Sequence, residues 1–237
     1  MSTTPALEIR NLTRRYGTVA ALDDLSLTLE PGRIVALFGE NGSGKTTLLK
    51  VISGLLAEYT GEVLVHGHRP GPESKAMVSF LPDQSFLPDT ISAATAVEMF
   101  SDFFADFDAA RATTLIADLG VDATRKLKTL SKGQREKVQL ALAMSRRARI
   151  YLLDEPISGV DPAAREVILN TILAQYDPDA LVVISTHLIA DIEAVADAAV
   201  FLRGGRVLMA GDADDLRASH GQSLDQLFRT AYQTTRS

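Results

Sequence analysis

One segment of the chain combines glycines, a lysine and threonines at a spacing that suits phosphate binding. It matches the G-x-x-x-x-G-K-[ST] pattern and comprises Gly39, Glu40, Asn41, Gly42, Ser43, Gly44, Lys45 and Thr46, with Thr47 next to it. Glycines let the backbone curl around an anion, and the positive end of a following helix attracts that anion. We expect Lys45 to reach the β- and γ-phosphates and the Thr46 hydroxyl to ligate Mg²⁺. The segment therefore predicts binding of a nucleoside triphosphate.

Two adjacent carboxylates, Asp154 and Glu155, end a short apolar run. Adjacent residues of a strand point to opposite faces, so the two acids can divide the work where the strand ends. Asp154 fits a partner for Mg²⁺ at the phosphate loop, and Glu155 fits the base that polarises an attacking water. A solvated acidic turn is the competing interpretation. Because a phosphate loop follows another strand of the same expected sheet, we favour a role in hydrolysis over an acidic turn.

The apolar pattern predicts the elements that must position these groups. Ile34–Phe38, Ile150–Leu153 and Leu181–Ile184 are continuous apolar runs, which are typical of strands covered on both faces in a parallel sheet. Leu7–Arg10 and Leu25–Leu29 alternate apolar and polar residues, as half-buried antiparallel strands do. The phosphate loop and the acid pair thus follow buried strands of one sheet.

The middle of the chain changes to helical spacing. Residues 91–119 are rich in Ala, Asp and Phe, and a second helical segment runs from Gly133 to Arg147. A third, Ser223–Tyr232, has the spacing of an amphipathic helix. In the first segment, one apolar stripe that we interpret as core is formed by Val97, Phe100, Phe103, Phe104 and Phe107. A glycine-rich hairpin is expected around Gly204.

Composition limits the classes of protein that fit. With 46% hydrophobic and 23% charged residues, the chain can bury a core, and its net charge of -6 disfavours a nucleic-acid partner. The absence of cysteine excludes disulfides, thiolate metal sites and a cysteine nucleophile. No signal-peptide pattern and no apolar run near the roughly 20 residues of a membrane span are evident. We expect a cytoplasmic protein that reaches a membrane through a partner.

A further motif precedes the second helical segment and indicates a family. Leu130, Ser131, Lys132, Gly133 and Gln134 resemble the LSGGQ signature of the ABC ATPases, with Lys132 where glycine is commonest. A serine before a helix is also an ordinary cap, so the motif alone would be weak. The resemblance gains weight because it extends over nearly the whole chain, with its motifs in the family's order.

The resemblance implies roles for several single residues. Tyr16 looks like the aromatic residue that stacks on adenine, and Gln84 is similar to the glutamine that senses Mg²⁺ and the attacking water. Asp161, in the segment Ser158–Asp161, resembles the acid of a loop that crosses to a partner subunit. His187 looks like the switch histidine that contacts the γ-phosphate. Catalysis would then rest on Glu155, His187, Gln84 and Lys45, and metal binding on Thr46, Gln84 and Asp154.

The family also implies partners. In its members, the signature residues of one subunit, here Ser131, Gly133 and Gln134, complete the ATP site of a second subunit. Two ABC ATPase chains, identical or different, would close head-to-tail around two Mg-ATP and drive a transmembrane permease. The sequence looks most like bacterial exporter-type subunits, located at the inner face of the cell membrane. A permease would dock near Gln84–Thr95, with Phe86 and Leu87 as contacts, although core packing explains these two equally well.

Other members of the family remain as alternatives. A chromosome-maintenance or repair ATPase would need a long coiled coil between Lys45 and Ser131, for which there is no room. A ribosome-associated ATPase would normally carry two such domains. An ATP-gated scaffold would bind nucleotide without turnover, and the presence of Glu155 favours hydrolysis over that role.

These interpretations predict an α/β fold. Its centre would be a P-loop NTPase core of the RecA-like type with a mixed sheet, joined by an N-terminal antiparallel β subdomain and an inserted α-helical subdomain. Residues 1–237 would form one ABC ATPase domain. Within it, residues 1–84 and 149–211 would form the nucleotide-binding core, 85–148 the helical subdomain with the signature, and 212–237 a helical tail.

Overall fold

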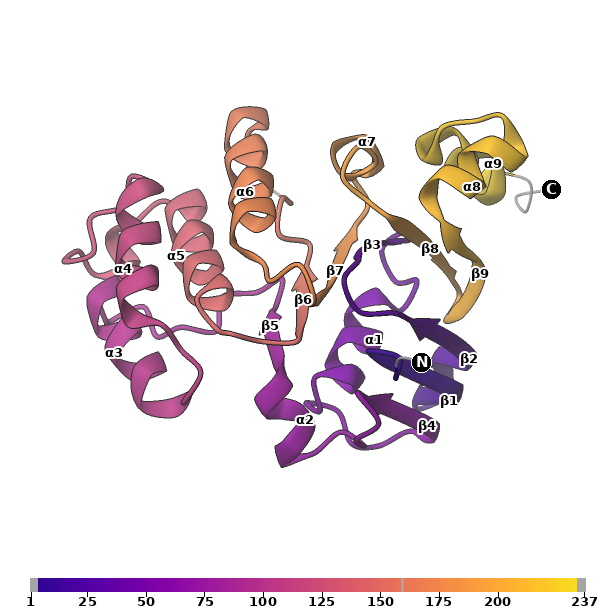
Figure 1. Ribbon diagram of the computed structural model, residues 1–237, viewed down its shortest axis with the longest axis horizontal. Helices are drawn as coiled ribbons and strands as arrows, with labels where there is room; N and C mark the ends of the chain where they lie inside the picture. Colours follow the sequence, from indigo (N-terminus) through magenta and orange to yellow (C-terminus); the bar gives the residue numbers. More distant parts are fainter. Residues whose placement is uncertain (1–3, 159, 234–237) are drawn as a thin grey trace.

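The central feature of the molecule is a six-stranded sheet. The computed structural model describes residues 4–158 and 160–233. The strands of the sheet are β3 (Ile34–Phe38), β5 (Val78–Leu81), β6 (Ile150–Asp154), β7 (Leu181–Thr186), β8 (Ala198–Arg203) and β9 (Arg206–Asp212). They lie in the order β5-β6-β7-β3-β8-β9 (Figure 1). The first five are mutually parallel and β9 is antiparallel to β8, so the sheet is mixed.

Both faces of this sheet are covered, as its apolar runs require. Every residue of β3, β6 and β7 is buried. Successive side chains of a strand point to opposite faces. Accordingly, Ala36 and Phe38 belong to one hydrophobic core, and Val35 and Leu37 belong to another. The strands that lead to the candidate site are therefore held from both sides.

A smaller antiparallel sheet and one helix cover the face that carries Val35 and Leu37. The sheet consists of β1 (Leu7–Tyr16), β2 (Val19–Leu29) and β4 (Thr60–Val65), in the order β2-β1-β4. Helix α1 (Lys45–Ile52) buries Leu48 and Leu49 in the core that also contains Leu7 of β1 and Val35 of β3. This helix begins directly after the phosphate loop, so its packing fixes the loop.

Three helices gather at the end of the molecule away from the antiparallel sheet (Figure 1). They are α3 (Ala93–Phe103), α4 (Ala109–Asp118) and α5 (Lys132–Met144), and a 3-10 turn at Leu127–Thr129 precedes α5. Each has a side-chain cap that accepts a hydrogen bond from the first turn, namely Ser92, Asp108 and Ser131. All three contribute to the larger hydrophobic core.

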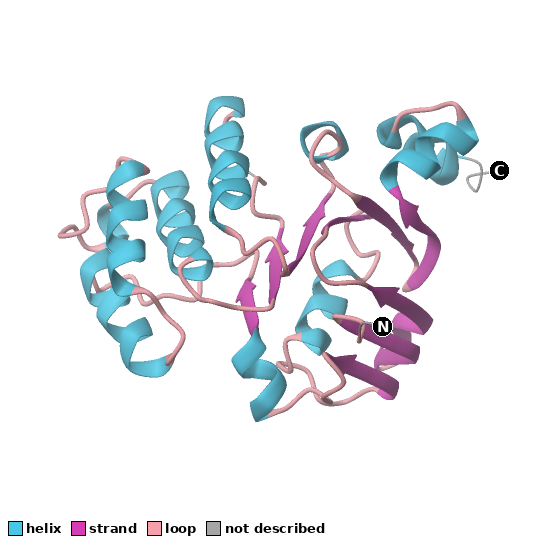
Figure 2. Ribbon diagram, in the orientation of Figure 1, coloured by secondary structure: helices cyan, strands magenta, loops and turns pink. Residues whose placement is uncertain are grey.

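The remaining helices connect or extend the central sheet (Figure 2). They are α2 (Pro72–Met77), α6 (Pro162–Gln175), α7 (Ile189–Ile192), α8 (Ala213–His220) and α9 (Leu224–Gln233). Tyr232 of α9 donates a hydrogen bond to the Leu202 carbonyl at 2.5 Å and stacks on Phe228 with ring centroids 4.1 Å apart. The hydrogen bond attaches the last helix to β8. Among the described residues, no helix combines the length and apolar character needed to cross a membrane.

The predicted fold class is confirmed, with differences in detail. β1 and β2 are longer than predicted because both continue past their alternating segments to a hairpin turn at Gly17. Short elements at α2, β5 and α7 were not predicted. The predicted phenylalanine stripe was wrong for Phe103, which is 76% exposed. Helix α3 ends there, and Phe104 turns to an extended conformation, so the helical period does not continue. Phe100 instead centres a ring cluster with Phe86, Phe104 and Phe107.

Candidate nucleotide-binding and hydrolytic site

The phosphate loop joins β3 to α1, and two of its glycines are required by close contacts. A Cβ on Gly39 would lie 2.3 Å from the Ser43 hydroxyl and 2.7 Å from the Leu202 carbonyl oxygen. Gly44 has a φ of 109° and lies against the Ala21 carbonyl, so a side chain there would be both strained and blocked. The loop is thus shaped by its own sequence and by the strands packed behind it.

A cavity of about 320 Å³ lies in front of this loop. The lining comes from the hairpin of β1 and β2, the phosphate loop, the start of α1 and the segments that follow β5 and β6. Its residues are Tyr16, Ala21, Glu40, Asn41, Gly42, Ser43, Gly44, Lys45, Thr46, Thr47, Asp83 and Glu155. Tyr16 is 48% exposed and the Arg14 guanidinium lies 4.6 Å from its ring centroid. An exposed aromatic face at the rim can receive a flat base, as predicted for adenine.

Among the described residues that line the cavity, Lys45 is the one with a cationic side chain. Its side chain is only 6% exposed, and its Nζ donates to the Gly39 carbonyl at 2.6 Å and to the Glu40 carbonyl at 3.4 Å. It also lies 3.3 Å from Oε1 of Glu155. Close by, the Ser43 hydroxyl is buried without a hydrogen-bond partner among the described residues. A phosphate group would supply acceptors to both side chains.

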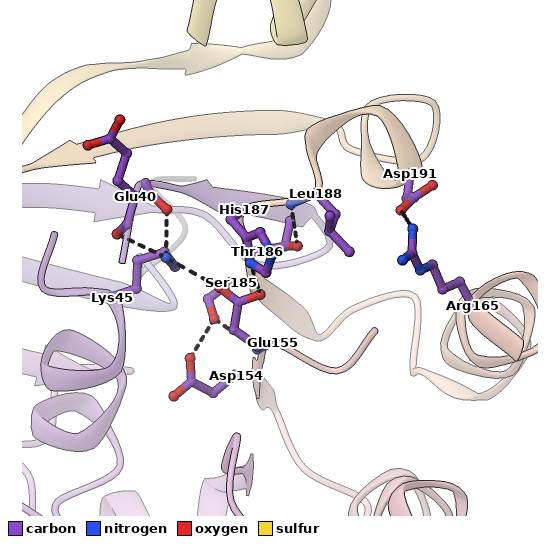
Figure 3. A network of polar contacts seen from close by, with 11 residues as sticks. Glu40, Lys45, Asp154, Glu155, Arg165, Ser185, Thr186, His187, Leu188 and Asp191 are labelled. Carbon is purple, nitrogen blue, oxygen red and sulfur yellow. Dashed lines mark hydrogen bonds and ion pairs between the residues drawn. The ribbon is translucent and has the colours of Figure 1, made fainter. Parts of the chain in front are cut away.

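Glu155 stands between Lys45 and His187 (Figure 3). Its Oε2 lies 2.9 Å from Nδ1 of His187, while its Oε1 faces Lys45. The Glu155 backbone has a φ of 52°, which is uncommon for a residue with a side chain. Its N–H is held by the carbonyl and hydroxyl oxygens of Ser185, at 3.1 and 3.0 Å. This turn at the end of β6 brings the carboxylate to the cavity, and such strain is a mark of functional positions.

Asp154 precedes it and lies deeper, with 1% exposure. Its Oδ1 accepts a hydrogen bond from the Ser185 hydroxyl at 2.6 Å, and its Oδ2 has no partner among the described residues (Figure 3). Burial raises the pKa of this carboxyl, the hydroxyls of Ser185 and Thr46 oppose the rise, and the negative charges of Asp83 and Glu155 add to it. An unpartnered buried carboxylate oxygen near a threonine hydroxyl fits a magnesium site.

The other predicted site residues lie away from this cavity. Ser131 caps α5 through a reciprocal pair of hydrogen bonds with Gln134, at 3.1 and 3.2 Å, and Gly133 follows in the first turn. Asp161 caps α6 by accepting from the backbone N–H of Ala164 at 3.0 Å. Both capping residues are exposed. Of the predicted loop before α6, Gly159 lies outside the described residues.

Gln84 is also exposed and does not line the cavity, whereas its neighbour Asp83 does. The sequence analysis missed Asp83. A signal was present, because β5 ends two residues before Asp83 and pairs in parallel with β6, which ends at Asp154. The carboxyl ends of parallel neighbours lie at one edge of a sheet, and ligands bind there in α/β folds.

Comparison with known proteins identifies the family. Residues 22–158 match the family model described as ABC transporter. A putative ABC transporter ATP-binding protein of Halobacterium salinarum is 35% identical over 222 residues, which cover 90% of this chain and 96% of that protein. The solved structure of an ATP-binding subunit of an ABC transporter has a TM-score of 0.86 and 28% identity, over 96% of this chain and 99% of its own. A dimeric bacterial ABC transporter cassette shares the fold, with a TM-score of 0.76 and 23% identity over 87% of this chain and 98% of its own.

The chain therefore belongs to the ABC transporter ATP-binding family. It is a nucleotide-binding ATPase, as the resemblance of its motifs predicted.

Proposed function

We propose that this chain is the ATP-hydrolysing subunit of a membrane exporter and works as a head-to-tail pair of cassettes. Each ATP would lie between the phosphate loop of one subunit and the Ser131 segment of the other. The permease would hold the pair at the cytoplasmic face of the membrane. Residues 1–84 and 149–211 would act as the nucleotide-binding core, 85–148 as the helical subdomain and 212–237 as a tail.

One observation carries this proposal: the cavity is built from one side only. Among the described residues that line it, none comes from the signature segment or from the start of α6. Yet the signature segment has an exposed serine at the start of a 13-residue helix, whose first N–H groups attract anions. A second copy would bring this helix to the open side of the cavity and exclude water from the phosphates.

The residues on the phosphate-loop side would divide the chemistry. Lys45 and the loop N–H groups would hold the β- and γ-phosphates, and Thr46 and Asp154 would hold Mg²⁺, which neutralises phosphate charge. Glu155 would accept a proton from the attacking water. His187, 2.9 Å from the Glu155 carboxylate, would orient that base and contact the γ-phosphate.

A phosphate that binds Lys45 would also change the state of Glu155. In the free chain Oε1 of Glu155 lies 3.3 Å from the ammonium of Lys45 and Oε2 lies 2.9 Å from His187, so both carboxylate oxygens are engaged. Phosphate oxygens would take over Lys45 and release one oxygen of Glu155 toward water. The base would thus become competent only after the nucleotide is bound.

The surface beside Phe86 is the proposed docking site for the permease. Phe86 is 43% exposed and lies on the ring cluster of the helical group, 6.0 Å from Phe100 between centroids. The other predicted contact, Leu87, is only 8% exposed and belongs to the hydrophobic core. Exposed aromatic residues are common anchors in protein interfaces. Phe86 is therefore the residue to test.

The dimer can be tested with a variant that binds ATP but does not consume it. Glu155→Gln should elute as a dimer on size-exclusion chromatography with Mg-ATP and as a monomer without it. Adding Ser131→Arg should abolish the dimer while leaving ATP binding intact, because it blocks only the side that faces the partner. A Glu155→Gln chain that stays monomeric at saturating Mg-ATP would contradict the head-to-tail site.

The permease can be tested by co-purification: a tagged chain extracted from its native membranes in mild detergent should retain a multi-span membrane protein. Phe86→Asp should release that protein, whereas Leu208→Asp, at a position with a similar exposure of 46%, should retain it. In inside-out membrane vesicles, an exporter should accumulate its substrate when ATP is added outside. Retention of the membrane protein by both variants, or no association in the wild type, would contradict the proposal.

A further inference from the structure

The structure brings Asp83, not Gln84, to the cavity that holds Lys45, Thr46 and Glu155. We propose that the Asp83 carboxylate is a second protein carboxylate for the divalent cation that accompanies the nucleotide, and that it makes nucleotide binding depend on that cation. The proposal rests on the nucleotide site proposed above. The sequence resemblance gave the role of metal ligand to the amide of Gln84, and this proposal gives that role to the neighbouring carboxylate of Asp83.

Strand pairing explains why Asp83 reaches the site. β5 and β6 are parallel, and Leu81 pairs with Leu153 at the carboxyl end of both. Asp154 follows Leu153 directly, and Asp83 follows Leu81 after one proline. The two acids therefore follow paired positions at the carboxyl ends of neighbouring strands. Gln84 is exposed and does not line the cavity.

The surroundings leave negative charge for a cation to balance. Asp154 is 1% exposed and its Oδ2 has no hydrogen-bond partner in the described chain. The nearby ammonium of Lys45 already faces Glu155 at 3.3 Å. Neither Asp83 nor Asp154 belongs to an ion pair among the residues that the structure describes. Unpaired buried charge is costly, so a cation at this edge would be favoured.

The donor set indicates which cation complex fits. The described residues contain no group of three His, Cys, Asp or Glu side chains that could hold a metal by themselves. Mg²⁺ is typically held in nucleotide sites by one or two carboxylates together with phosphate oxygens and water. The pair Asp83 and Asp154, with the Thr46 hydroxyl, matches the protein share of such a site. The cation would thus be retained only when phosphates are present.

A carboxylate at position 83 has a consequence that an amide would lack. Without a cation, its charge would repel the phosphates of an incoming nucleotide; with a cation, the same charge would attract the complex. Asp83 should therefore widen the difference in affinity between the free nucleotide and its magnesium complex. This difference, the Kd in EDTA divided by the Kd in excess Mg²⁺, is the quantity to measure.

The experiment is calorimetric titration of ADP, which is not hydrolysed, into wild type, Asp83→Asn and Gln84→Ala. We expect Asp83→Asn to lower the ratio of Kd values about tenfold or more, through weaker binding in Mg²⁺ and unchanged or tighter binding in EDTA. Gln84→Ala should leave both Kd values unchanged. Electron paramagnetic resonance of Mn²⁺ with ADP should show weaker Mn²⁺ retention for Asp83→Asn only. Asp83 is exposed, so both variants should melt as the wild type does.

Two results would overturn the assignment of Asp83. One is an unchanged ratio in Asp83→Asn; the other is a loss in Gln84→Ala that equals or exceeds the loss in Asp83→Asn. A wild-type chain that binds ADP equally well in EDTA and in Mg²⁺ would instead contradict the magnesium site at Thr46 and Asp154. Failure of this inference and failure of the proposed site are therefore distinguishable.

Discussion

Replacing Glu155 by glutamine should separate ATP binding from ATP hydrolysis. Glutamine keeps the size and one acceptor oxygen of the side chain but cannot take a proton from water. A positioned general base typically contributes 10² to 10⁴ in rate, so turnover should fall by this factor, or about 3–5 kcal/mol of transition-state stabilisation. The fall should appear in kcat with little change in KM, because the loop and Lys45 still bind the phosphates.

The contacts of Glu155 also predict the effect on folding. Its carboxylate is 11% exposed and faces Lys45 at 3.3 Å, but Lys45 keeps the Gly39 carbonyl at 2.6 Å when that charge is removed. We therefore expect the free energy of unfolding of the nucleotide-free variant to be about 1–2 kcal/mol lower than that of the wild type, which corresponds to a Tm lower by roughly 2–8 °C. With Mg-ATP present, the variant should instead have the higher Tm, because it does not hydrolyse the bound ATP that stabilises it.

Phosphate release, ATP titration and thermal melting with and without Mg-ATP measure these three quantities. Glu73→Gln, which removes a carboxylate that is 78% exposed and distant in sequence from the motifs, is the matched control and should behave as wild type. Unchanged phosphate release from Glu155→Gln would refute its assignment as the base. A Kd for ATP more than tenfold weaker would show that Glu155 serves binding instead.

Three other changes test separate parts of the molecule. Lys45→Ala should weaken ATP binding by at least tenfold in calorimetry, because Lys45 is the one cationic side chain lining the described part of the cavity; normal affinity would contradict the phosphate-loop geometry. Burial raises the pKa of the Glu136 carboxyl above its ordinary value of 4.5, and the positive charge of Lys132 opposes this rise. The protonated carboxyl therefore stabilises the fold below pH 4.5, and this stabilisation is lost as the pH rises through the pKa of the folded state. The Tm of Glu136→Gln minus the Tm of the wild type should therefore increase between pH 4.5 and 7.5. A difference in Tm that stays constant over this range would contradict the raised pKa of Glu136. Tyr232→Phe removes the hydrogen bond to the Leu202 carbonyl and should cost about 1 kcal/mol, seen as a lower Tm in thermal melts; the pKa of Tyr232, raised by burial to about 12, keeps that donor protonated at working pH.

The parts of the fold that the sequence predicted well are those in which local pattern and tertiary environment agree. Ile34–Phe38 is apolar throughout because it is covered on both faces, and the loop after it has glycines where a Cβ would collide. Asp154 and Glu155 were placed at the end of a buried strand, where they are found. In each case a property of the backbone dictated the residue type.

The errors arose where the outcome depends on neighbours distant in sequence. Phe103 shares the helical period of Phe100 but lies at the last turn of α3, beyond the packed face. Asp83 and Gln84 are adjacent polar residues after a proline, and nothing local distinguishes them. The pairing of Leu81 with Leu153 brings the end of β5 beside the end of β6, and Asp83 then lines the cavity. Strand register is a long-range property, so the sequence pattern alone did not single out Asp83 as a residue that lines the cavity.

The charges around the cavity give a reason to expect that the ligand arrives as a metal complex and that one subunit alone would be a poor catalyst. Lys45 and Glu155 balance each other in the free chain, while Asp83 and Asp154 form no ion pair with the residues that the structure describes. A bare triphosphate would engage Lys45 but add repulsion at the two aspartates, whereas its magnesium complex satisfies both sides at once. Binding would then free Glu155 from Lys45, yet water would still reach the phosphates from the open side of the cavity. Closure by the Ser131 helix of a second copy would remove that water, so turnover should rise steeply with the concentration of the chain, through the range in which the Mg-ATP dimer forms.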